Sequence, residues 1–213
     1  MKIVATLGFT LFAALGALSS ALADDVAVLY IKMPGEKQLQ RVVIEFYEKE
    51  APKTVANFKK LVSDRFYNGI AFHRVFPHTL VQAGDPQSRS KDRRNVGTGG
   101  PGYTLPPEIS HRKHVPGTVA MARLGDKVNP ARVSNGSQFY VALTLLPHLD
   151  GQYTIFGNVI EGLEVLDQIS VKPADTNDNP VDRITIEQAQ IIPRENLASL
   201  KPKTAKKFKI WPF

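Results

Sequence analysis

Two polar side chains in the middle of the chain, Arg74 and Gln82, stand where their neighbours are apolar. A strand through this segment would place Phe72 and Arg74 on one face, with His73 and Val75 on the other. Arginine keeps its charge and offers a planar set of donors, so its chemistry would be electrostatic and would need no proton transfer. A lone arginine is rarely buried unless it is paired. Alternation alone therefore favours an ion pair at a barrel rim and leaves a functional role as the open alternative.

Two other patterns that could do chemistry are better explained as loops. Residues 97–102 fit the G-x-G-x-x-G pattern of nucleotide-binding proteins, but Pro101 excludes the helix which that fingerprint requires. His111 and His114 are three residues apart and could share a metal on a helix. Pro116 and the polar context instead predict a solvated loop, with no further ligand at a fitting spacing. Cysteine is absent, which excludes thiolate metal sites and cysteine nucleophiles.

The elements that must position these residues are mostly short strands. Helical spacing of apolar residues predicts one helix that begins at Pro52 and ends near Asp64, and a second over 163–169. The long polar segment 87–107 predicts a functional loop. Many strands with only two helices are typical of a closed β-barrel or a sandwich. Strands are expected at 26–31, 42–46, 70–76, 80–82, 117–122, 139–143, 154–159 and 184–192.

The first 23 residues have the pattern of a secretory signal. Lys2 gives a positive start, residues 3–18 are apolar or small, and the run ends A-L-A before Asp24. An uncleaved membrane anchor is the alternative, although the run is short for a span of about 20 residues. An exported protein without cysteine must be stabilised by its core alone. We therefore expect a signal peptide at 1–23, one domain at 24–192 and a tail at 193–213.

The expected tail holds most of the excess positive charge. It contains six basic residues against Glu195, whereas the rest of the mature chain is almost neutral and gives little long-range steering of charged substrates. The tail ends with lysines interleaved among aromatic residues, including Trp211. This pattern suits an anionic membrane surface or an acidic partner protein, with a solvated tail as the alternative. Nucleic acid would attract the same charge, but export argues against such a partner.

Several segments of the chain together resemble the cyclophilin family over about residues 26–192. The resemblance implies a mainly β fold, a closed eight-stranded antiparallel barrel capped by two α-helices. It implies peptidyl-prolyl cis–trans isomerase activity without a metal or a cofactor. The matching segments are A-P-K-T-V-A-N-F at 51–58, F-H-R-V at 72–75, L-V-Q-A-G-D at 80–85, G-T-G-G at 97–100, P-G-T-V-A-M-A at 116–122, N-G-S-Q-F at 135–139, L-D-G at 149–151 and I-F-G at 155–157.

The resemblance also implies roles for single residues. Arg74 matches the family's catalytic arginine, and Gln82 matches the glutamine that steadies it and touches the substrate backbone. Ala122 and Arg123 match the strand edge that holds an extended peptide. The implied substrate-binding residues are Phe72, Leu80, Ala122, Arg123, Gln138, Tyr140, His148, Leu149 and Tyr153.

Several positions depart from the family pattern, and three of them bear on the pocket and on drug binding. Thr79 and Tyr140 stand where phenylalanine is usual, which predicts a smaller or more polar proline pocket. His148 stands where many relatives have tryptophan, which predicts weak binding of cyclosporin. These departures leave the expected catalytic residues in place but change the walls around them.

The chemistry implied by the resemblance needs no covalent intermediate. Rotation about an X-Pro bond is slow because the C–N bond is partly double, with a barrier of ~18–20 kcal/mol. A guanidinium that donates toward the prolyl nitrogen favours the twisted amide, which is catalysis by preferential binding. We therefore expect an isomerase acting on proline-containing polypeptides among exported, folding proteins.

Two other functions stay open at the level of the sequence. The domain could be a proline-peptide binding module or chaperone with weak turnover, or an interaction protein whose tail is the functional part. The C-terminus shows no retention-like sequence, so a bacterial periplasm is the expected location and secretion the alternative. The sequence gives no basis for an oligomeric state.

Overall fold

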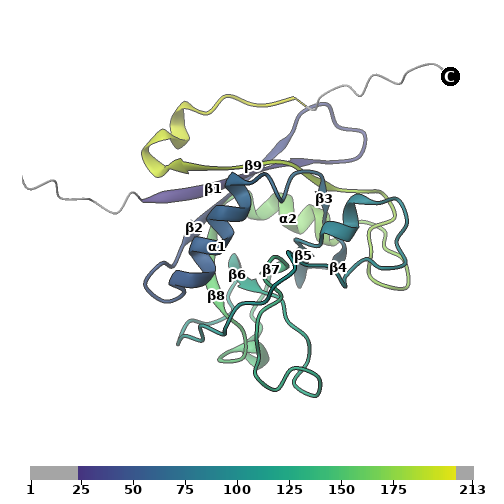
Figure 1. Cartoon of the computed structure of the whole chain (residues 1–213). Coiled ribbons are helices and arrows are strands. Elements are labelled where there is room, and N and C mark those ends of the chain that lie inside the picture. Colours follow the sequence, from purple (N-terminus) through teal and green to yellow (C-terminus); the bar gives the residue numbers. More distant parts are fainter. Residues whose placement is uncertain (1–23, 205–213) are drawn as a thin grey trace, which may run out of the picture.

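The computed structural model describes residues 24–204, so the expected signal segment 1–23 and residues 205–213 lie outside the described residues. A single sheet of nine strands, in the order β3-β9-β1-β2-β8-β6-β7-β5-β4, curls around one core (Figure 1). The strands are β1 (Asp25–Lys32), β2 (Gln40–Phe46), β3 (Ile70–Ala71), β4 (Arg74–Phe76), β5 (Leu80–Ala83), β6 (Thr118–Met121), β7 (Phe139–Ala142), β8 (Ile155–Glu161) and β9 (Thr185–Pro193). The helical elements are α1 (Pro52–Ser63), α2 (Leu163–Ser170) and the short 3-10 turns η1 (Pro86–Arg89), η2 (Pro147–Leu149) and η3 (Arg194–Ser199).

The two end strands of the sheet are parts of one chain segment. β3 pairs with β9 and β4 pairs with β5, and only Phe72 and His73 separate β3 from β4. Each strand pair of the described sheet is antiparallel. Counted as one interrupted strand, residues 70–76 give the eight strands expected from the sequence. The predicted fold class is confirmed, and the break at Phe72 and His73 explains the ninth strand.

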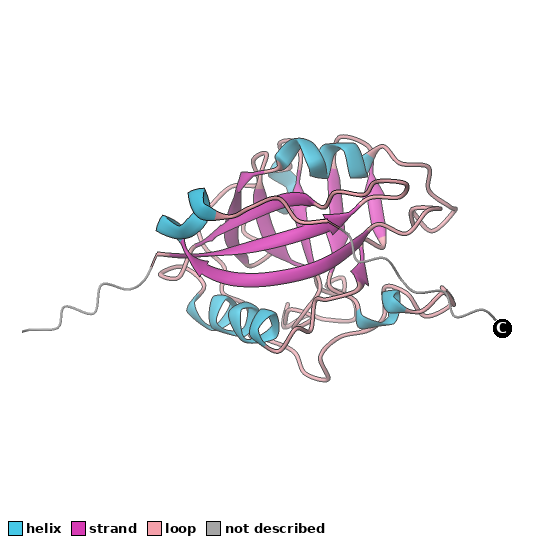
Figure 2. Cartoon of the chain, turned by 90° about the horizontal axis from the view of Figure 1, so that it is seen from above, coloured by secondary structure: helices cyan, strands magenta, loops and turns pink. Residues whose placement is uncertain are grey.

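Both helices bury an apolar face in the same core, from opposite sides of the strands (Figure 2). Helix α1 begins at Pro52, as predicted, because proline suits the first helical turn. Its preceding residue, Ala51, has no side chain that could cap the free N–H groups. The Glu108 carboxylate does so instead, accepting hydrogen bonds from the N–H groups of Lys53 (3.0 Å) and Thr54 (2.8 Å). The long loop 87–107 and its continuation are thereby attached to α1.

Phe58 of α1 lies at the centre of the core. Its ring centroid is 4.9 Å from Tyr67, 5.5 Å from Phe139, 5.2 Å from Phe156 and 5.9 Å from Phe46. The contacts with Phe139 and Phe46 are edge-to-face, a geometry that aromatic rings prefer. The helix is therefore fixed against strands β2, β7 and β8 by one side chain.

Strand β1 is buried on both faces. Ala27, Leu29 and Ile31 point into the main core, while Val26, Val28 and Tyr30 of the opposite face form a second apolar cluster with Val43. Barrel strands that face water alternate with polar residues. The run 26–31 lacks that alternation because something covers its outer face.

The cover is the segment 194–204, which we call the C-terminal strap. Leu197 and Leu200 pack on the second apolar cluster. The Leu39 N–H donates to the Lys203 carbonyl at 2.8 Å, and the Lys203 ammonium lies 4.1 Å from the Tyr30 ring centroid. The sequence placed a detached tail after 192. The strap instead continues the packed domain to residue 204, because its two leucines cover apolar strand surface.

No helix within residues 24–204 is long and apolar enough to cross a membrane.

The strap should contribute to stability. Replacing Leu197 and Leu200 together with alanine should lower the free energy of unfolding by roughly 1–2 kcal/mol for each half-buried leucine. Urea unfolding followed by circular dichroism measures the difference. Leu124→Ala is the matched control, because Leu124 is 68% exposed and exposed substitutions rarely matter. Equal stability of the double variant and the control would show that the strap rests on the barrel without supporting it.

Candidate functional site

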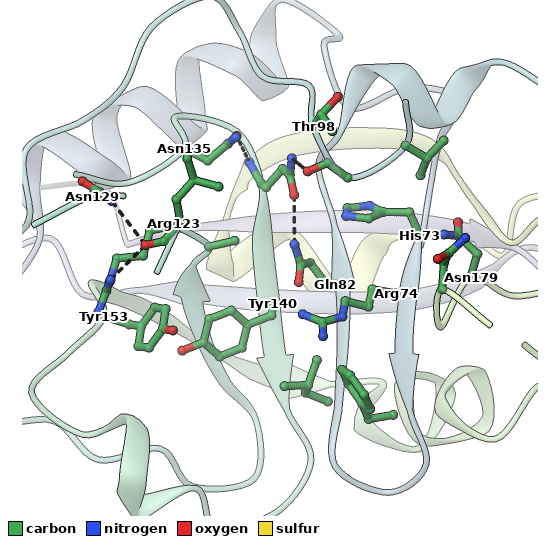
Figure 3. A pocket seen from close by; sticks show the side chains of 18 of the residues that line it. His73, Arg74, Gln82, Thr98, Arg123, Asn129, Asn135, Tyr140, Tyr153 and Asn179 are labelled. Carbon is green, nitrogen blue, oxygen red and sulfur yellow. Dashed lines mark hydrogen bonds between the residues drawn. The ribbon is translucent and has the colours of Figure 1, made fainter. Parts of the chain in front are cut away.

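A groove of about 970 Å³ is lined by side chains of β4, β5 and β7 and of the loops around them (Figure 3). It is lined by ten of the eleven residues that the sequence analysis named: Arg74, Leu80, Gln82, Ala122, Arg123, Gln138, Tyr140, His148, Leu149 and Tyr153. The eleventh, Phe72, is 2% exposed and lies in the main core. The expectation that Phe72 and Arg74 share a face is wrong, because the strand is interrupted between them.

Arg74 and Gln82 face each other across β4 and β5. The two residues are direct partners in the antiparallel register, so their side chains project from the same face. The Arg74 side chain is 49% exposed. Its guanidinium carbon lies 4.6 Å from the Phe76 ring centroid, and its Nε donates to Asp178 Oδ2 at 3.3 Å. The Gln82 amide donates instead to Gln138 Oε1 at 2.9 Å. The side chain that holds Arg74 is thus Asp178, where the sequence analysis expected Gln82.

Asp178 is a site residue that the sequence analysis missed. It lies in the loop between α2 and β9, with φ of 62°, and its carbonyl accepts a hydrogen bond from the Val75 N–H at 2.9 Å. Asp175 Oδ1 accepts from the N–H groups of Asn177 (2.8 Å) and Asn179 (3.1 Å) and shapes this loop. The run of Asp and Asn predicts a turn. Its position beside Arg74 follows only from the pairing of β3 with β9.

Gln138 connects the groove floor to the glycine-rich loop. It is 2% exposed, and its Nε2 donates to the carbonyls of Gly97 (3.0 Å) and Gly99 (2.7 Å). Asp85, fully buried, accepts from the Gly97 N–H. A Cβ on Gly99 would lie 2.2 Å from Asp85 Oδ1, so only glycine fits there. The segment is a loop, as predicted, and these contacts hold it in place as a wall of the groove.

The guanidinium of Arg123 is buried and paired, although Arg123 lines the groove. Its side chain is 3% exposed. The Nε donates to the Gln152 carbonyl at 3.0 Å, Nη1 donates to Asp126 Oδ1 at 2.5 Å, and the guanidinium carbon lies 4.6 Å from the Tyr153 ring centroid. The positive charge is therefore compensated, and the side chain serves to fix the loop that follows β6.

The main chain at Ala122 is already occupied. Its N–H donates to the Gln138 carbonyl and its carbonyl accepts from the Asn135 N–H, both at 2.9 Å. An extended peptide therefore cannot pair with Ala122. Within residues 24–204, the main-chain N–H and C=O of Arg123 make no hydrogen bond. The strand edge expected from the sequence is reduced to Arg123.

His114 is buried, which corrects the prediction of a solvated loop histidine. It is 1% exposed. Its Nδ1 lies 3.0 Å from Asp150 Oδ1, and its Nε2 lies 2.8 Å from the Tyr140 hydroxyl. The Tyr140 hydroxyl, which was expected to make the pocket more polar, is thus bound to His114, which does not line the groove. Burial lowers the pKa of His114 despite the neighbouring Asp150 carboxylate.

His73 lines the groove beside Arg74 but is nearly inaccessible to solvent. The sequence analysis placed it on the opposite strand face, and the interrupted strand explains the difference. Burial lowers its pKa, so the ring is neutral at neutral pH and is a poor candidate for acid–base work there. Within residues 24–204, no group of three or more histidine, aspartate and glutamate side chains is placed to hold a metal ion.

Comparison with known proteins gives consistent results. A family model described as cyclophilin type peptidyl-prolyl cis-trans isomerase/CLD matches residues 30–191. The peptidyl-prolyl cis-trans isomerase of Synechococcus elongatus is 43% identical over 122 residues, which cover 57% of this chain and 75% of that protein. The enzyme of the same description from Helicobacter pylori strain 26695 is 41% identical over 132 residues, covering 60% and 73% respectively.

A solved structure is similar over the same region. A cyclophilin type peptidyl-prolyl cis-trans isomerase of Cryptosporidium parvum, crystallised in the presence of the dipeptide Ala-Pro, superposes with a TM-score of 0.67 and 28% sequence identity. The match covers 78% of this chain and 98% of that one.

The two buried histidines should make stability depend on pH. Their pKa values are lowered by burial in the folded protein, whereas in the unfolded chain they lie near ~6.5. Below that value the unfolded state binds more protons, so the free energy of unfolding is fully present above about pH 6.5 and falls as the pH drops below it. Urea unfolding at about pH 7.5 and pH 5 tests this. His111 is exposed, and His111→Gln should keep the same pH dependence. A free energy of unfolding that is equal at both pH values would contradict burial of neutral His73 and His114.

Proposed function

The chain belongs to the family of cyclophilin-type peptidyl-prolyl cis–trans isomerases, and from that premise we propose that it accelerates X-Pro rotation in exported, folding proteins through electrostatic stabilisation by Arg74. The observation that carries the proposal is the pairing of Arg74 and Gln82 on the groove face. The guanidinium of Arg74 stands at the edge of an apolar floor, where a proline ring and a donor could meet the same amide. No proton has to move, so the reaction needs neither an acid nor a base.

The ion pair with Asp178 suits this role. Asp178 contacts Nε, the inner nitrogen of the guanidinium, so both terminal nitrogens remain directed to the groove. A half-exposed ion pair of this kind contributes little to stability. Its effect is to restrict the arginine to orientations in which its terminal nitrogens face a prolyl nitrogen, which is preorganisation.

The apolar floor suits a proline ring. Ala120, Tyr140 and Ile155 form a cluster on the outer face of the strands, and Leu80 and Leu149 pack against it. Holding the ring while the carbonyl side rotates lowers the entropy cost of reaching the twisted amide. The Cryptosporidium parvum neighbour was crystallised with Ala-Pro, which supports proline-containing polypeptides as the partners of this groove.

The alternative is a binding module with weak turnover. Its support from the sequence was the polar character of Thr79 and Tyr140. The Tyr140 hydroxyl is bound to His114, so its ring faces the groove much as phenylalanine would, and Thr79 is the remaining departure. This favours the enzyme over the binding module, and turnover on a short X-Pro peptide separates the two.

Export is the second part of the proposal. The signal pattern of residues 1–23 supports export, and a chain without cysteine needs no disulfide in an oxidising compartment. We propose a bacterial periplasm as the location, with secretion as the alternative. Proline isomerisation is slow enough to limit folding, so newly exported chains are its expected substrates.

Arg74→Ala should lower kcat/KM for an X-Pro peptide by roughly 10²–10³, the usual scale for removing one electrostatic stabiliser. The free energy of unfolding should change by less than about 1 kcal/mol, because the ion pair is half exposed. A coupled or NMR exchange assay measures the rate. Arg65→Ala, at an exposed position after α1, is the control and should keep wild-type turnover. Near-normal turnover in folded Arg74→Ala would refute the mechanism.

The basic end of the chain should bind an anionic membrane surface. Replacing Lys206, Lys207 and Lys209 with alanine should weaken co-sedimentation of the mature chain with phosphatidylserine vesicles by roughly a hundredfold, since each basic residue contributes ~1 kcal/mol near such a surface. Added salt should release the wild type by screening.

A matched control keeps the net charge of the variant equal while sparing the end of the chain. Lys49, Lys91 and Lys127 are exposed positions of the barrel, and their triple replacement with alanine should retain binding. If the two triple variants bind the vesicles equally, only the net charge of the chain matters and the position of the lysines does not. The membrane role of the tail is then rejected, and an acidic protein partner or no partner remains.

A further inference from the structure

Three side chains form a hydrogen-bonded row directly behind the groove wall. Asp150 Oδ1 lies 3.0 Å from His114 Nδ1, and His114 Nε2 lies 2.8 Å from the hydroxyl of Tyr140. The rings of His114 and Tyr140 are stacked, with an interplanar angle of 8° and centroids 5.9 Å apart. Only Tyr140 reaches the groove. His114 is 1% and Tyr140 5% exposed, so these two members are shielded from water, whereas the Asp150 side chain is 15% exposed.

The direction of the two hydrogen bonds follows from the chemistry of the partners. An ionised carboxylate only accepts, and hydrogen bonds from His114 keep the pKa of Asp150 below its usual range. Nδ1 of His114 therefore carries the proton. Nε2 is then an acceptor, so the Tyr140 hydroxyl must donate to it. In this state every polar atom of the row is satisfied, and the hydroxyl hydrogen of Tyr140 points away from the groove.

His114 also fixes a second wall of the groove. Its N–H donates to Asp150 Oδ1 at 2.8 Å, and its carbonyl accepts from the Leu146 N–H at 3.0 Å. The segment 146–150 carries His148 and Leu149, which line the groove. One buried residue thus links the strand that supplies Tyr140 with the segment that supplies the opposite wall.

We propose that His114 is a positioning residue for the proline-binding floor, and that its protonation weakens substrate binding while leaving the chemical step intact. The inference rests on the proposed function, since it assigns a role to the floor of the same groove. Arg74 stays charged throughout the relevant range of pH. His73 and His148 also line the groove, so a change in binding between about pH 5 and 7.5 is assigned to His114 only where it disappears when the Tyr140 hydroxyl is removed.

Protonation changes what His114 can do. The imidazolium is a donor at both nitrogens, so the Tyr140 hydroxyl can no longer donate to Nε2. The hydroxyl becomes an acceptor, and its own hydrogen must turn toward the groove or remain without a partner. A polar hydrogen at the floor or a displaced ring makes a poorer site for an apolar proline ring.

The charges around His114 and its burial determine the pH at which it becomes protonated. Asp150 favours the imidazolium, whereas burial and the neighbouring His148 oppose it, and the net effect lowers the pKa of His114. Lys113 lies 3.4 Å from Asp150 Oδ2 and weakens its pull. On the far side of Tyr140 stand Arg123, already paired with Asp126, and Tyr153. The change in binding is therefore expected below the ordinary histidine value of ~6.5.

The test is the pH dependence of KM and kcat for one X-Pro peptide with the mature chain. KM of the wild type should rise roughly fivefold from about pH 7.5 to pH 5, within the range set by loss of one buried hydrogen bond, while kcat stays constant. Tyr140→Phe removes the hydroxyl, so its KM should not change with pH. His114→Gln keeps an acceptor but cannot titrate, and its KM should be equally independent of pH.

The outcomes separate this inference from general destabilisation and from failure of the proposed function. Partial unfolding at low pH would lower kcat per total protein and leave KM unchanged, which would overturn the proposal. A KM that rises equally in wild type and Tyr140→Phe would also overturn it, even if His114→Gln does not fold. Absence of turnover at every pH would refute the proposed function itself, whereas normal turnover with a constant KM would refute only the role of His114.

Discussion

The contact between Phe58 and Phe139 inside the barrel determines most of the site outside it. Side chains alternate across a strand, so fixing Phe139 and Val141 in the core directs Gln138 and Tyr140 to the groove face. The helix that carries Phe58 is in turn held by the capping carboxylate of a distant loop. The groove floor is therefore formed by the same strands that pack the core with their other face. Because the core is close-packed, the floor is rigid as well.

The groove is rich in arginine, yet its charges are balanced. Each of its arginines has an aspartate partner, so the groove as a whole offers no strong field to charged substrates. The pairs instead fix the surrounding loops. Among the four arginines the side chain of Arg94 is 86% exposed and that of Arg74 49%, and Arg74 is the one that lies opposite Gln82 in the register of β4 and β5. The four pairs are Arg74–Asp178, Arg93–Asp175, Arg94–Asp92 and Arg123–Asp126.

The sequence by itself determined the class of fold and most of the lining of the groove. Short alternating runs predicted the strands, and Pro52 with its helical apolar pattern predicted α1. The motifs around Arg74 and Gln138 are local, so resemblance could identify them and the strand period could direct most of them to one face. Periodicity could not foresee the break at Phe72 and His73, since it depends on the exchange of partner from β9 to β5.

Only the tertiary structure decided which residues meet across long distances in the sequence. Asp178 beside Arg74 and His114 behind Tyr140 are polar residues in turn-like segments, where local pattern predicts solvent exposure. From the sequence the strap was interpreted as a tail, because two leucines among polar and charged residues give no periodic pattern. In the structure these leucines cover the outer face of β1. Burial and ion pairing depend on what lies opposite a residue in space. Sequence spacing carries that information within one strand or helix, and closure of the barrel supplies the rest.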